Sequence, residues 1–496
     1  MGRKILRCAS VLALAAFTSS CGGEESGSAP PPVQSVVPEP SPTPSPSQRP
    51  LAINQVGGLQ NVLVIMVDDL RTEVGAYGSP VARTPHIDQL AREGATFDNA
   101  YVSFAACTPS RMSFLTGRRP TPDDIALRDG FTVNRTFSDG VTLPDLFKAQ
   151  GFRTLSFGKV YHYERDDADA WSERFASAEV PFLTQHGFRD AEGKMTTPTH
   201  VWNGSSPLPD EINVAAATNA MAKFAAQPER LFMAVGIHRP HLNWIATETD
   251  WASYNSTMLP RVVNPEGQIG APPYAMPINS EFQGQLQLRD FGNDIPEDVA
   301  VNLRHGYMAS VTHADRMVGR LLEGLREAGL DHNTAVILWS DHGYRLGDNG
   351  RWGKWSVHTL DTRVPLIMRV PTLTKPGRRV QAVVETVDLF PSIADLMGLT
   401  PPETAIGRSV KPLLEGAVPG WRNVARSFTV RPVPENPLLG DAVNTARFRY
   451  TVWTDKTGKV LSRELYDKEI DPDESINRID DPGYTDVVGW LESLRV

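Results

Sequence analysis

Five runs of nearly continuous apolar residues constrain the fold more than any other feature of the sequence. They are NVLVIMV (61–67), RTLSFG (153–158), LFMAVGI (231–237), TAVILWS (334–340) and VPLIMRV (364–370). Unbroken apolar runs of this length predict strands that are buried on both faces. Helical patterns at 87–94, 143–151, 212–227 and 301–329 lie between them. This alternation predicts an α/β fold with a large, mainly parallel sheet that is covered by helices on both faces.

The pattern changes near residue 416. The segments VARSFTV, ARFRYTVWT and KVLSRELYD alternate apolar and polar side chains and are joined by turn-like stretches. They predict a smaller C-terminal antiparallel α+β subdomain over 416–496, and we expect the main domain over 58–415. Within the main domain, 244–296 is rich in Pro, Gly and Asn, which predicts a long surface insertion that shapes substrate access.

The N-terminus has the pattern of a targeting segment. The basic stretch MGRKILR precedes a short apolar run, ASVLALAAF, and the small residues of TSSC end at Cys21. This pattern predicts a signal peptide over 1–21, because the apolar run is too short to span a membrane. Small residues before a cysteine resemble a bacterial lipoprotein cleavage box, in which Cys21 becomes lipidated; plain secretory cleavage nearby is the alternative. We expect a protein exported to the periplasm or cell surface, with a lipid anchor as its membrane contact.

The N-terminal segment also predicts a linker and determines how many cysteines remain in the folded part. Residues 22–57 are rich in Pro and Ser and predict a disordered linker. Cys8 leaves with the signal and Cys21 is lipidated or removed, so Cys107 remains as the single cysteine of the folded part. No internal disulfide is then expected. Cys107 is either a small buried hydrophobe or a functional thiol.

The net charge narrows the class of ligand. The chain carries a formal charge of −9 at pH 7, which argues against nucleic acid as a partner. If the ligand is an anion, the positive charge that it meets must be concentrated in a pocket.

Polar residues gather where four of the predicted strands end. Asp68 and Asp69 follow the first run, Lys159 and His162 the second, His238 the third, and Asp341 and His342 the fourth. In open α/β sheets, ligands bind outside the carboxyl ends of the strands. The carboxylates would repel one another unless a cation neutralised them. Ligation mostly by oxygen favours Ca²⁺ or Mg²⁺ over zinc.

The stretch FAACTPSRMSFLTGRRP (104–120) places Cys107 at the start of a predicted helix. Pro109 suits the first turn of a helix, so Cys107 would lie at an N-terminus, where anions are favoured. Arg111 is four residues later on the same face. Lys159 and Lys354 would add two positive groups. Together, the helix N-terminus and these three positive side chains suit the binding of a tetrahedral oxyanion.

These motifs resemble those of the sulfatase family. CTPSR followed by SFLTGRRP is similar to the signature Cys-x-Pro-Ser-Arg, and NVLVIMVDDLR, TPHIDQLA, GKVYH, HRPH, SDHGYRLGDNGRWGKWS and RVPLIMRVP occur in the order expected of that family. Asp-His after the late strand, Gly-Lys-Val-aromatic-His and His-Arg-Pro-His resemble the iduronate-2-sulfatase branch most closely. The resemblance covers roughly 61–482. It implies the alkaline-phosphatase-like fold and the hydrolysis of sulfate esters.

The resemblance also implies a cofactor and roles for individual residues. A formylglycine-generating enzyme would convert Cys107 to formylglycine, whose hydrate attacks sulfur. One Ca²⁺ would be bound by Asp68, Asp69, Asp341, His342 and the modified Cys107. Arg111 would hold the hydrate, and Lys159 and Lys354 would bind the sulfate oxygens. His162 would take a proton when sulfate is eliminated. His238 would act as general acid beside the leaving oxygen, with Lys354 as a second candidate donor.

We therefore expect a sulfatase that acts on a sulfated saccharide, most simply the 2-O-sulfate of a uronate in a glycosaminoglycan or an algal polysaccharide. Two alternatives are a phosphonate or phosphodiester hydrolase of the same superfamily and a non-catalytic glycan-binding lipoprotein. Tyr344 stands where the branch has a tryptophan, and we expect it to face the substrate. Arg345 and Arg351 are expected at the solvated surface, and the alternative is that they meet a uronate carboxylate near the site. The roles of His241 and His358 stay open.

Overall fold

The computed structural model describes residues 57–121, 140–162, 167–176, 179–190, 193–277, 294–433 and 436–495, with short pieces at 125–126, 132–133, 282, 287–288 and 291. The expected signal peptide, 1–21, lies outside the described residues. So does the expected linker, 22–57, except for its last residue. Among the described residues, no helix is both long enough and apolar enough to cross a membrane.

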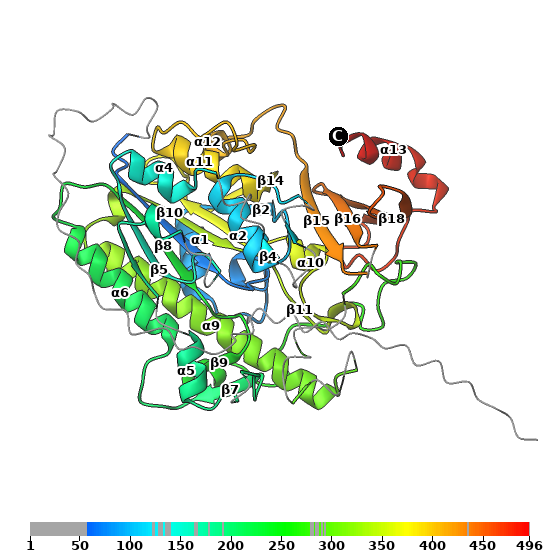
Figure 1. The fold of residues 1–496 in the computed structure, drawn as a ribbon, viewed down its shortest axis with the longest axis horizontal. Helices are drawn as coiled ribbons and strands as arrows, with labels where there is room; N and C mark the ends of the chain where they lie inside the picture. Colours follow the sequence, from blue (N-terminus) through cyan, green and yellow to red (C-terminus); the bar gives the residue numbers. More distant parts are fainter. Residues whose placement is uncertain are drawn as a thin grey trace, which may run out of the picture.

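A single large sheet forms the centre of the molecule, and the prediction of a mainly parallel sheet is confirmed (Figure 1). In spatial order its strands are β14 (Arg378–Glu385), β2 (Ala95–Tyr101), β13 (Leu366–Arg369), β10 (Thr334–Ser340), β1 (Asn61–Val67), β8 (Leu231–Ile237), β5 (Arg153–Gly158) and β6 (Glu173–Phe175). β13 runs antiparallel to both of its neighbours, and every other pair is parallel. Because β1, β5, β8 and β10 all run in one direction, their carboxyl ends meet at one edge.

Helices cover both faces of this sheet, as predicted. One face packs against α1 (Pro85–Glu93), α6 (Pro209–Phe224) and α9 (Glu297–Glu327); the other packs against α2 (Cys107–Thr116), α4 (Leu143–Ala149), α11 (Leu389–Leu396) and α12 (Lys411–Glu415). Figure 1 shows α6 and α9 below the sheet and α11 and α12 above it. Successive residues of β1 alternate between the two cores, Val64 on one side and Ile65 on the other. Both are fully buried, which explains the unbroken apolar run.

The C-terminal part is an antiparallel sheet with one helix, as predicted. Its strands are β15 (Ala425–Arg431), β16 (Leu438–Asn444), β17 (Phe448–Thr454) and β18 (Val460–Asp467), and α13 (Thr485–Ser493) packs on it through Leu491. The Phe428 N–H donates to the Ser103 carbonyl at 2.8 Å. β15 therefore lies directly against the chain that leads into Cys107.

The expectation of a surface insertion over 244–296 is wrong for its first residues. β9 (Trp244–Thr247) pairs in parallel with β7 (Thr199–Trp202) and continues into α7 (Glu248–Trp251). The Trp244 side chain is fully buried among Tyr307, Tyr344 and Trp352. The apolar side chains of β9 therefore belong to the core. Further along, the Ile269 N–H donates to the Ser475 carbonyl at 2.8 Å, so this segment rests on the C-terminal part.

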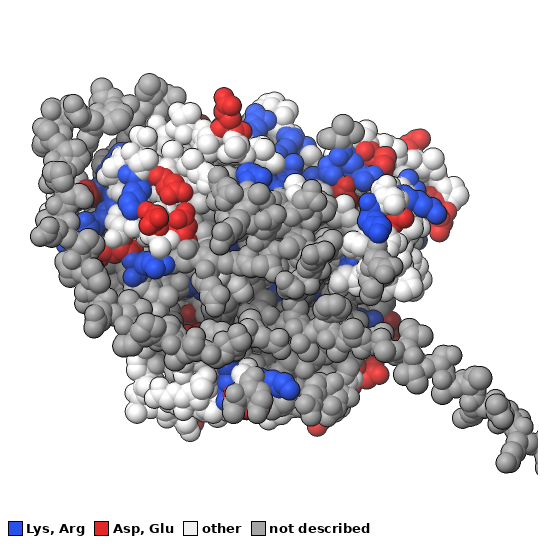
Figure 2. All heavy atoms as spheres, viewed as in Figure 1, with Lys and Arg blue, Asp and Glu red and all other residues white. Residues whose placement is uncertain are grey.

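The remaining short elements are β3 (Ile125–Ala126), β4 (Thr132–Val133), α5 (Glu179–Gln185), β11 (Arg345–Leu346), β12 (Trp352–Gly353) and α10 (Thr359–Thr362). On the described part of the face in Figure 2, basic and acidic side chains are interspersed over both the main and the C-terminal parts. That part of the surface offers no broad basic area, in keeping with the net charge of −9.

Candidate active site

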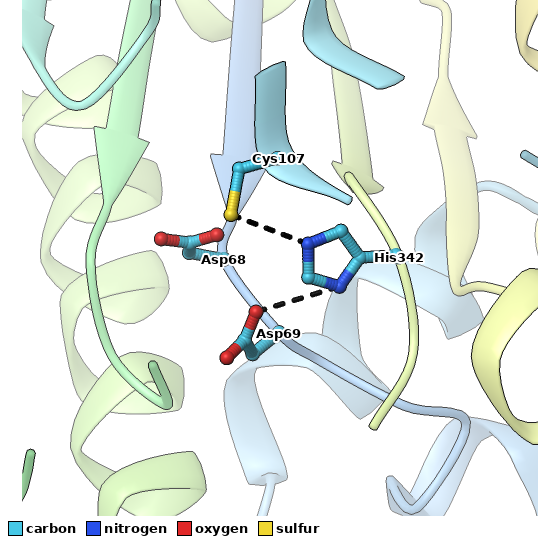
Figure 3. A group of neighbouring side chains, drawn as sticks. All are labelled: Asp68, Asp69, Cys107 and His342. Carbon is cyan, nitrogen blue, oxygen red and sulfur yellow. Dashed lines mark hydrogen bonds and ion pairs between the residues drawn. The ribbon is translucent and has the colours of Figure 1, made fainter. Parts of the chain in front are cut away.

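Asp68 and Asp69 follow β1 directly, at the carboxyl edge of the sheet, and both are fully buried. Asp69 has a φ of 61°, a left-handed conformation that is uncommon for a residue other than glycine. Its N–H donates to Asp341 Oδ1 at 3.2 Å, and its carbonyl accepts from the Tyr307 hydroxyl at 2.9 Å. These contacts hold the turn, so that both carboxylates point toward Cys107 (Figure 3).

Cys107 is the first residue of α2, as predicted, and it is buried. Its Sγ lies 3.4 Å from His342 Nε2, 3.5 Å from Lys354 Nζ and 3.8 Å from Lys159 Nζ. A cysteine of the apolar core would not have three nitrogen atoms within this distance. The structure therefore favours the functional interpretation of Cys107 over the buried hydrophobe.

Four of the five predicted metal ligands form one cluster. A ligand atom from each of Asp68, Asp69, Cys107 and His342 lies within 4.8 Å of all the others (Figure 3). Asp68 Oδ1 and Asp69 Oδ2 are buried and receive no hydrogen bond from any described residue. Buried carboxylate oxygens without a hydrogen bond are costly, and a hard cation such as Ca²⁺ binds such oxygens. The side chains present therefore fit a cation.

The fifth predicted ligand, Asp341, lies beside this cluster with its oxygens engaged. Its Oδ2 accepts from Arg111 Nε at 2.8 Å, and its Oδ1 lies 3.7 Å from His342 Nε2. Arg111 is fully buried, and its Nη2 lies 3.4 Å from Asp68 Oδ1. Arg111 therefore links two carboxylates from different strand ends, which fixes the spacing between them.

The two predicted lysines also lie against carboxylates. The Lys159 ammonium bonds to Asp68, and Lys354 Nζ lies 2.7 Å from Asp69 Oδ1. Each lysine therefore contacts both a carboxylate and the Cys107 sulfur. The two positive groups flank Cys107 as a pair, which is the geometry that an anion with several oxygens requires.

The pKa values of the site residues are shifted because several carboxylates are buried close together. Burial raises the pKa of Asp341 to about 7, against the opposing effect of Arg111. Burial also raises the pKa of Asp69, although Lys354 opposes it. Burial and Cys107 would raise the pKa of Asp68. Lys159, Arg111 and His241 nevertheless hold this pKa well below the usual range. Burial would lower the pKa of His342, but Asp341, Cys107 and Asp69 together raise that pKa to about 9.

The predicted catalytic histidines, His162 and His238, both interact electrostatically with Lys159. His238 follows β8; its N–H donates to Asp210 Oδ1 at 2.8 Å, and its Nδ1 lies 3.9 Å from Asp68 Oδ2. Its ring is 4.8 Å from the His241 ring, centre to centre. Burial and His241 lower the pKa of His238 well below its usual value, which favours the neutral ring. Burial and Lys159 lower the pKa of His162 to about 3.

Two expectations about neighbouring residues are wrong. Tyr344 is fully buried, with its ring stacked on Tyr307 at 6.0 Å between centroids, and does not face a substrate. Arg345 is also fully buried; its Nε donates to Asp361 Oδ1 at 2.9 Å and its NH2 to the Lys354 carbonyl at 3.0 Å. β11, which pairs with β12, follows Asp341 and His342 closely in the chain and carries Arg345 into the interior. Arg351 is half-buried.

The sequence analysis gave no role to Tyr307 and left His358 open. Tyr307 is on α9, and its hydroxyl both donates to the Asp69 carbonyl and accepts from the Arg71 N–H. It occurs within an apolar helical stripe, so no sequence signal separates it from ordinary core residues. His358 lies 3.1 Å from Glu474 Oε2 and accepts from the Leu360 N–H, so its contacts link α10 to the C-terminal part.

The fold and this site define an α/β protein in which two lysines and a cysteine lie beside buried carboxylates. Comparison with known proteins identifies the family. Residues 60–399 match the sulfatase family, and 347–494 match the C-terminal region described as N-sulphoglucosamine sulphohydrolase. The chain belongs to the sulfatase family, and it is a sulfuric ester hydrolase.

Individual relatives agree with this assignment. The chain is 30% identical to iduronate 2-sulfatase of Mus musculus, over 88% of this chain and 93% of that protein. Its structure superposes on BT4656, solved with D-glucosamine-2-N,6-O-disulfate, with a TM-score of 0.69 and 22% identity, over 88% of this chain and 97% of that one. The phosphonate monoester hydrolase of Silicibacter pomeroyi gives the same TM-score and identity, over 88% and 94% of the two chains. At these identities the solved structures establish the fold alone.

Proposed function

We propose that this sulfatase hydrolyses the 2-O-sulfate of a uronate in a glycosaminoglycan or an algal polysaccharide. The observation that carries the proposal is the position of Cys107, at the N-terminus of α2 with Lys159, Lys354 and His342 around its sulfur. The similarity to iduronate 2-sulfatase supports the choice of sugar. The non-catalytic glycan-binding alternative is set aside, since the chain is a sulfuric ester hydrolase with this site intact.

The nucleophile that we propose is formylglycine at position 107, made from Cys107 by a formylglycine-generating enzyme. The cysteine sulfur stands where the oxygens of the formylglycine hydrate would lie. The hydrate supplies an oxygen nucleophile, which is better suited than a thiol to attack on sulfur. Burial of the side chain at a helix N-terminus keeps competing water away and favours an anion there.

The metal that we propose is Ca²⁺, held by Asp68, Asp69, Asp341, His342 and the modified Cys107. When bound, it supplies positive charge that favours the ionised form of the nucleophile. Asp68 Oδ1 and Asp69 Oδ2, which are buried and receive no hydrogen bond from any described residue, support this assignment. Arg111 orients the carboxylates of Asp68 and Asp341 and holds the hydrate.

The remaining residues divide the work on the sulfate group. Lys159, which is paired with Asp68, and Lys354, which is paired with Asp69, bind the sulfate oxygens. Their positive charge stabilises the transition state in a buried site. His162 lies close enough to Cys107 for the two to interact electrostatically, and we assign it the proton that is lost when sulfate is eliminated. His238 is assigned to the leaving oxygen of the sugar, with Lys354 as the charged donor nearby.

We further propose the domain limits and the location given by the sequence. The main domain over 58–415 carries the site residues, and the C-terminal subdomain over 416–496 packs against the Cys107 loop through β15. Residues 1–21 would direct export, and a lipid on Cys21 would anchor the protein in the periplasm or at the cell surface, with 22–57 as the linker.

The test compares substrates on the matured enzyme. The kcat/KM should be highest for a saccharide that ends in a 2-O-sulfated uronate, lower for the matching 6-O-sulfated amino sugar, and lowest for a phosphonate monoester or phosphate diester with the same leaving group. A preference for the 6-O-sulfate would refute the proposed sugar. Preference for the phosphorus ester would favour the alternative hydrolase.

A further inference from the structure

Trp355 has a backbone conformation that is costly for its residue type. It directly follows Lys354 and has a φ of 78°, in the left-handed region where bulky side chains are rare. Such a conformation is strained and persists where the surroundings impose it, frequently at functional sites.

Both backbone polar groups of Trp355 are held by other segments. Its N–H donates to the Ala105 carbonyl at 3.1 Å, two residues before Cys107. Its carbonyl accepts from Thr429 Oγ1 and from an Arg431 nitrogen, each at 2.7 Å, both on β15. The nucleophile loop and the C-terminal sheet together impose the conformation.

The indole is packed at one edge and is not fully covered. It meets the Phe104 ring edge-on, with 6.1 Å between centroids and 83° between planes. It also packs against the cluster of Phe104, Ala106 and Val430. Trp355 is half-buried, whereas Lys354 before it is buried with Nζ 3.5 Å from the Cys107 sulfur. Part of Trp355 is therefore accessible to solvent, directly after the buried Lys354.

We propose that the exposed part of the Trp355 indole is a platform for the sugar ring of the substrate, and that it sets the specificity for saccharides. This inference rests on the proposed function. The C–H groups of a pyranose carry slight positive charge and pack on the negative face of an aromatic ring. Ligand pockets commonly combine such an aromatic wall with a few placed polar groups. Lysines and Cys107 bind the sulfate group, while Trp355 binds the ring that carries it.

The test separates sugar binding from sulfate binding with three variants. Trp355→Leu removes the aromatic face and keeps an apolar side chain, Trp355→Phe keeps a ring, and Trp490→Leu on α13 is the control, because Trp490 is 48% exposed and on the C-terminal helix. For each variant, KM and kcat are measured on a 2-O-sulfated uronate disaccharide. The inhibition constants of inorganic sulfate and of the desulfated disaccharide are measured on the same preparations.

For Trp355→Leu we expect the KM of the disaccharide and the inhibition constant of its desulfated product to rise about tenfold, a typical effect of losing an aromatic contact. Inhibition by inorganic sulfate should stay within about twofold, Trp355→Phe should restore most of the affinity, and Trp490→Leu should match the wild type. Unchanged sugar affinity in Trp355→Leu would overturn the platform. An equal loss of sulfate affinity would also overturn it and would make Trp355 a support for Lys354. If the wild-type enzyme hydrolyses no sulfated saccharide, the proposed function itself fails.

Discussion

The hydroxyl of Tyr307 supports the turn that presents Asp69, and Tyr307→Phe removes that hydroxyl alone. Tyr307 is fully buried; its hydroxyl donates to the Asp69 carbonyl at 2.9 Å and accepts from the Arg71 N–H at 3.1 Å. The variant leaves two backbone groups unpaired in the interior, at about 1–3 kcal/mol each. We expect the free energy of unfolding in the presence of a chelator to fall by about 2–6 kcal/mol in total.

The same change should weaken calcium binding. Asp69 keeps its left-handed φ of 61° through contacts on its N–H and its carbonyl, and Tyr307→Phe removes the second. Loss of an outer contact to a metal ligand typically lowers metal affinity about 10–100-fold. Calorimetric titration of Ca²⁺ into the chelated protein measures the affinity, and urea unfolding measures the stability.

Tyr254→Phe is the matched control. The Tyr254 hydroxyl also has two partners, the Arg83 N–H and Thr312 Oγ1, both at 2.8 Å, and neither is a site residue. It should lose a similar amount of stability and bind Ca²⁺ as the wild type does. Equal calcium affinities for Tyr307→Phe and the wild type would refute the reasoning, and so would an equal loss of affinity in both variants.

Three further changes test separate parts of the account. Asp68→Asn should lower calcium affinity and turnover together, and Ca²⁺ added after chelation should restore the wild type to full activity; undiminished turnover in metal-free wild-type enzyme would contradict this. His238→Ala should lower kcat about 10²–10⁴-fold on a sugar sulfate and much less on a nitrophenyl sulfate, whose leaving group barely needs a proton; equal losses would mean that His238 positions sulfate only. Glu474 is buried, and although burial opposes them, Arg449 and His358 lower its pKa to about 2, so Glu474→Gln should destabilise the protein at pH 7 by about 3–5 kcal/mol. Because a lowered carboxyl pKa stabilises the fold above the unfolded value, this loss should shrink as the pH falls below about 4.5; a loss that is the same at pH 7 and pH 4 would refute it.

The strands that the sequence predicted best are those buried on both faces. The boundaries of β1, β5, β8 and β10 agree with their apolar runs to the residue. β2 was not predicted, because ATFDNAY mixes polar and apolar residues. Its Asp98 and Asn99 side chains form hydrogen bonds with the neighbouring strand β14. The direction of β13 was also not predictable, since an apolar run reports burial and says nothing of strand direction.

The site shows a similar limit. Asp68, Asp69, Cys107 and His342 were grouped correctly, because strand ends in a parallel sheet converge. Tyr344 and Arg345 were misplaced, because the inward turn after His342 depends on β11 and β12, which have two residues each and no sequence signature. The contact between Tyr307 and Asp69 spans 238 residues of sequence and depends on how α9 lies across the sheet.

The central claim is that a modified Cys107 cleaves the sulfate ester, and the mass of the Cys107 peptide tests it most directly. The protein is prepared with and without a formylglycine-generating enzyme, and turnover of a 2-O-sulfated uronate disaccharide is measured on the same samples. We predict that the peptide from active samples carries an aldehyde or its hydrate in place of the thiol, and that turnover rises in proportion to this modified fraction. Full turnover in a sample whose Cys107 peptide carries only the free thiol would contradict the account.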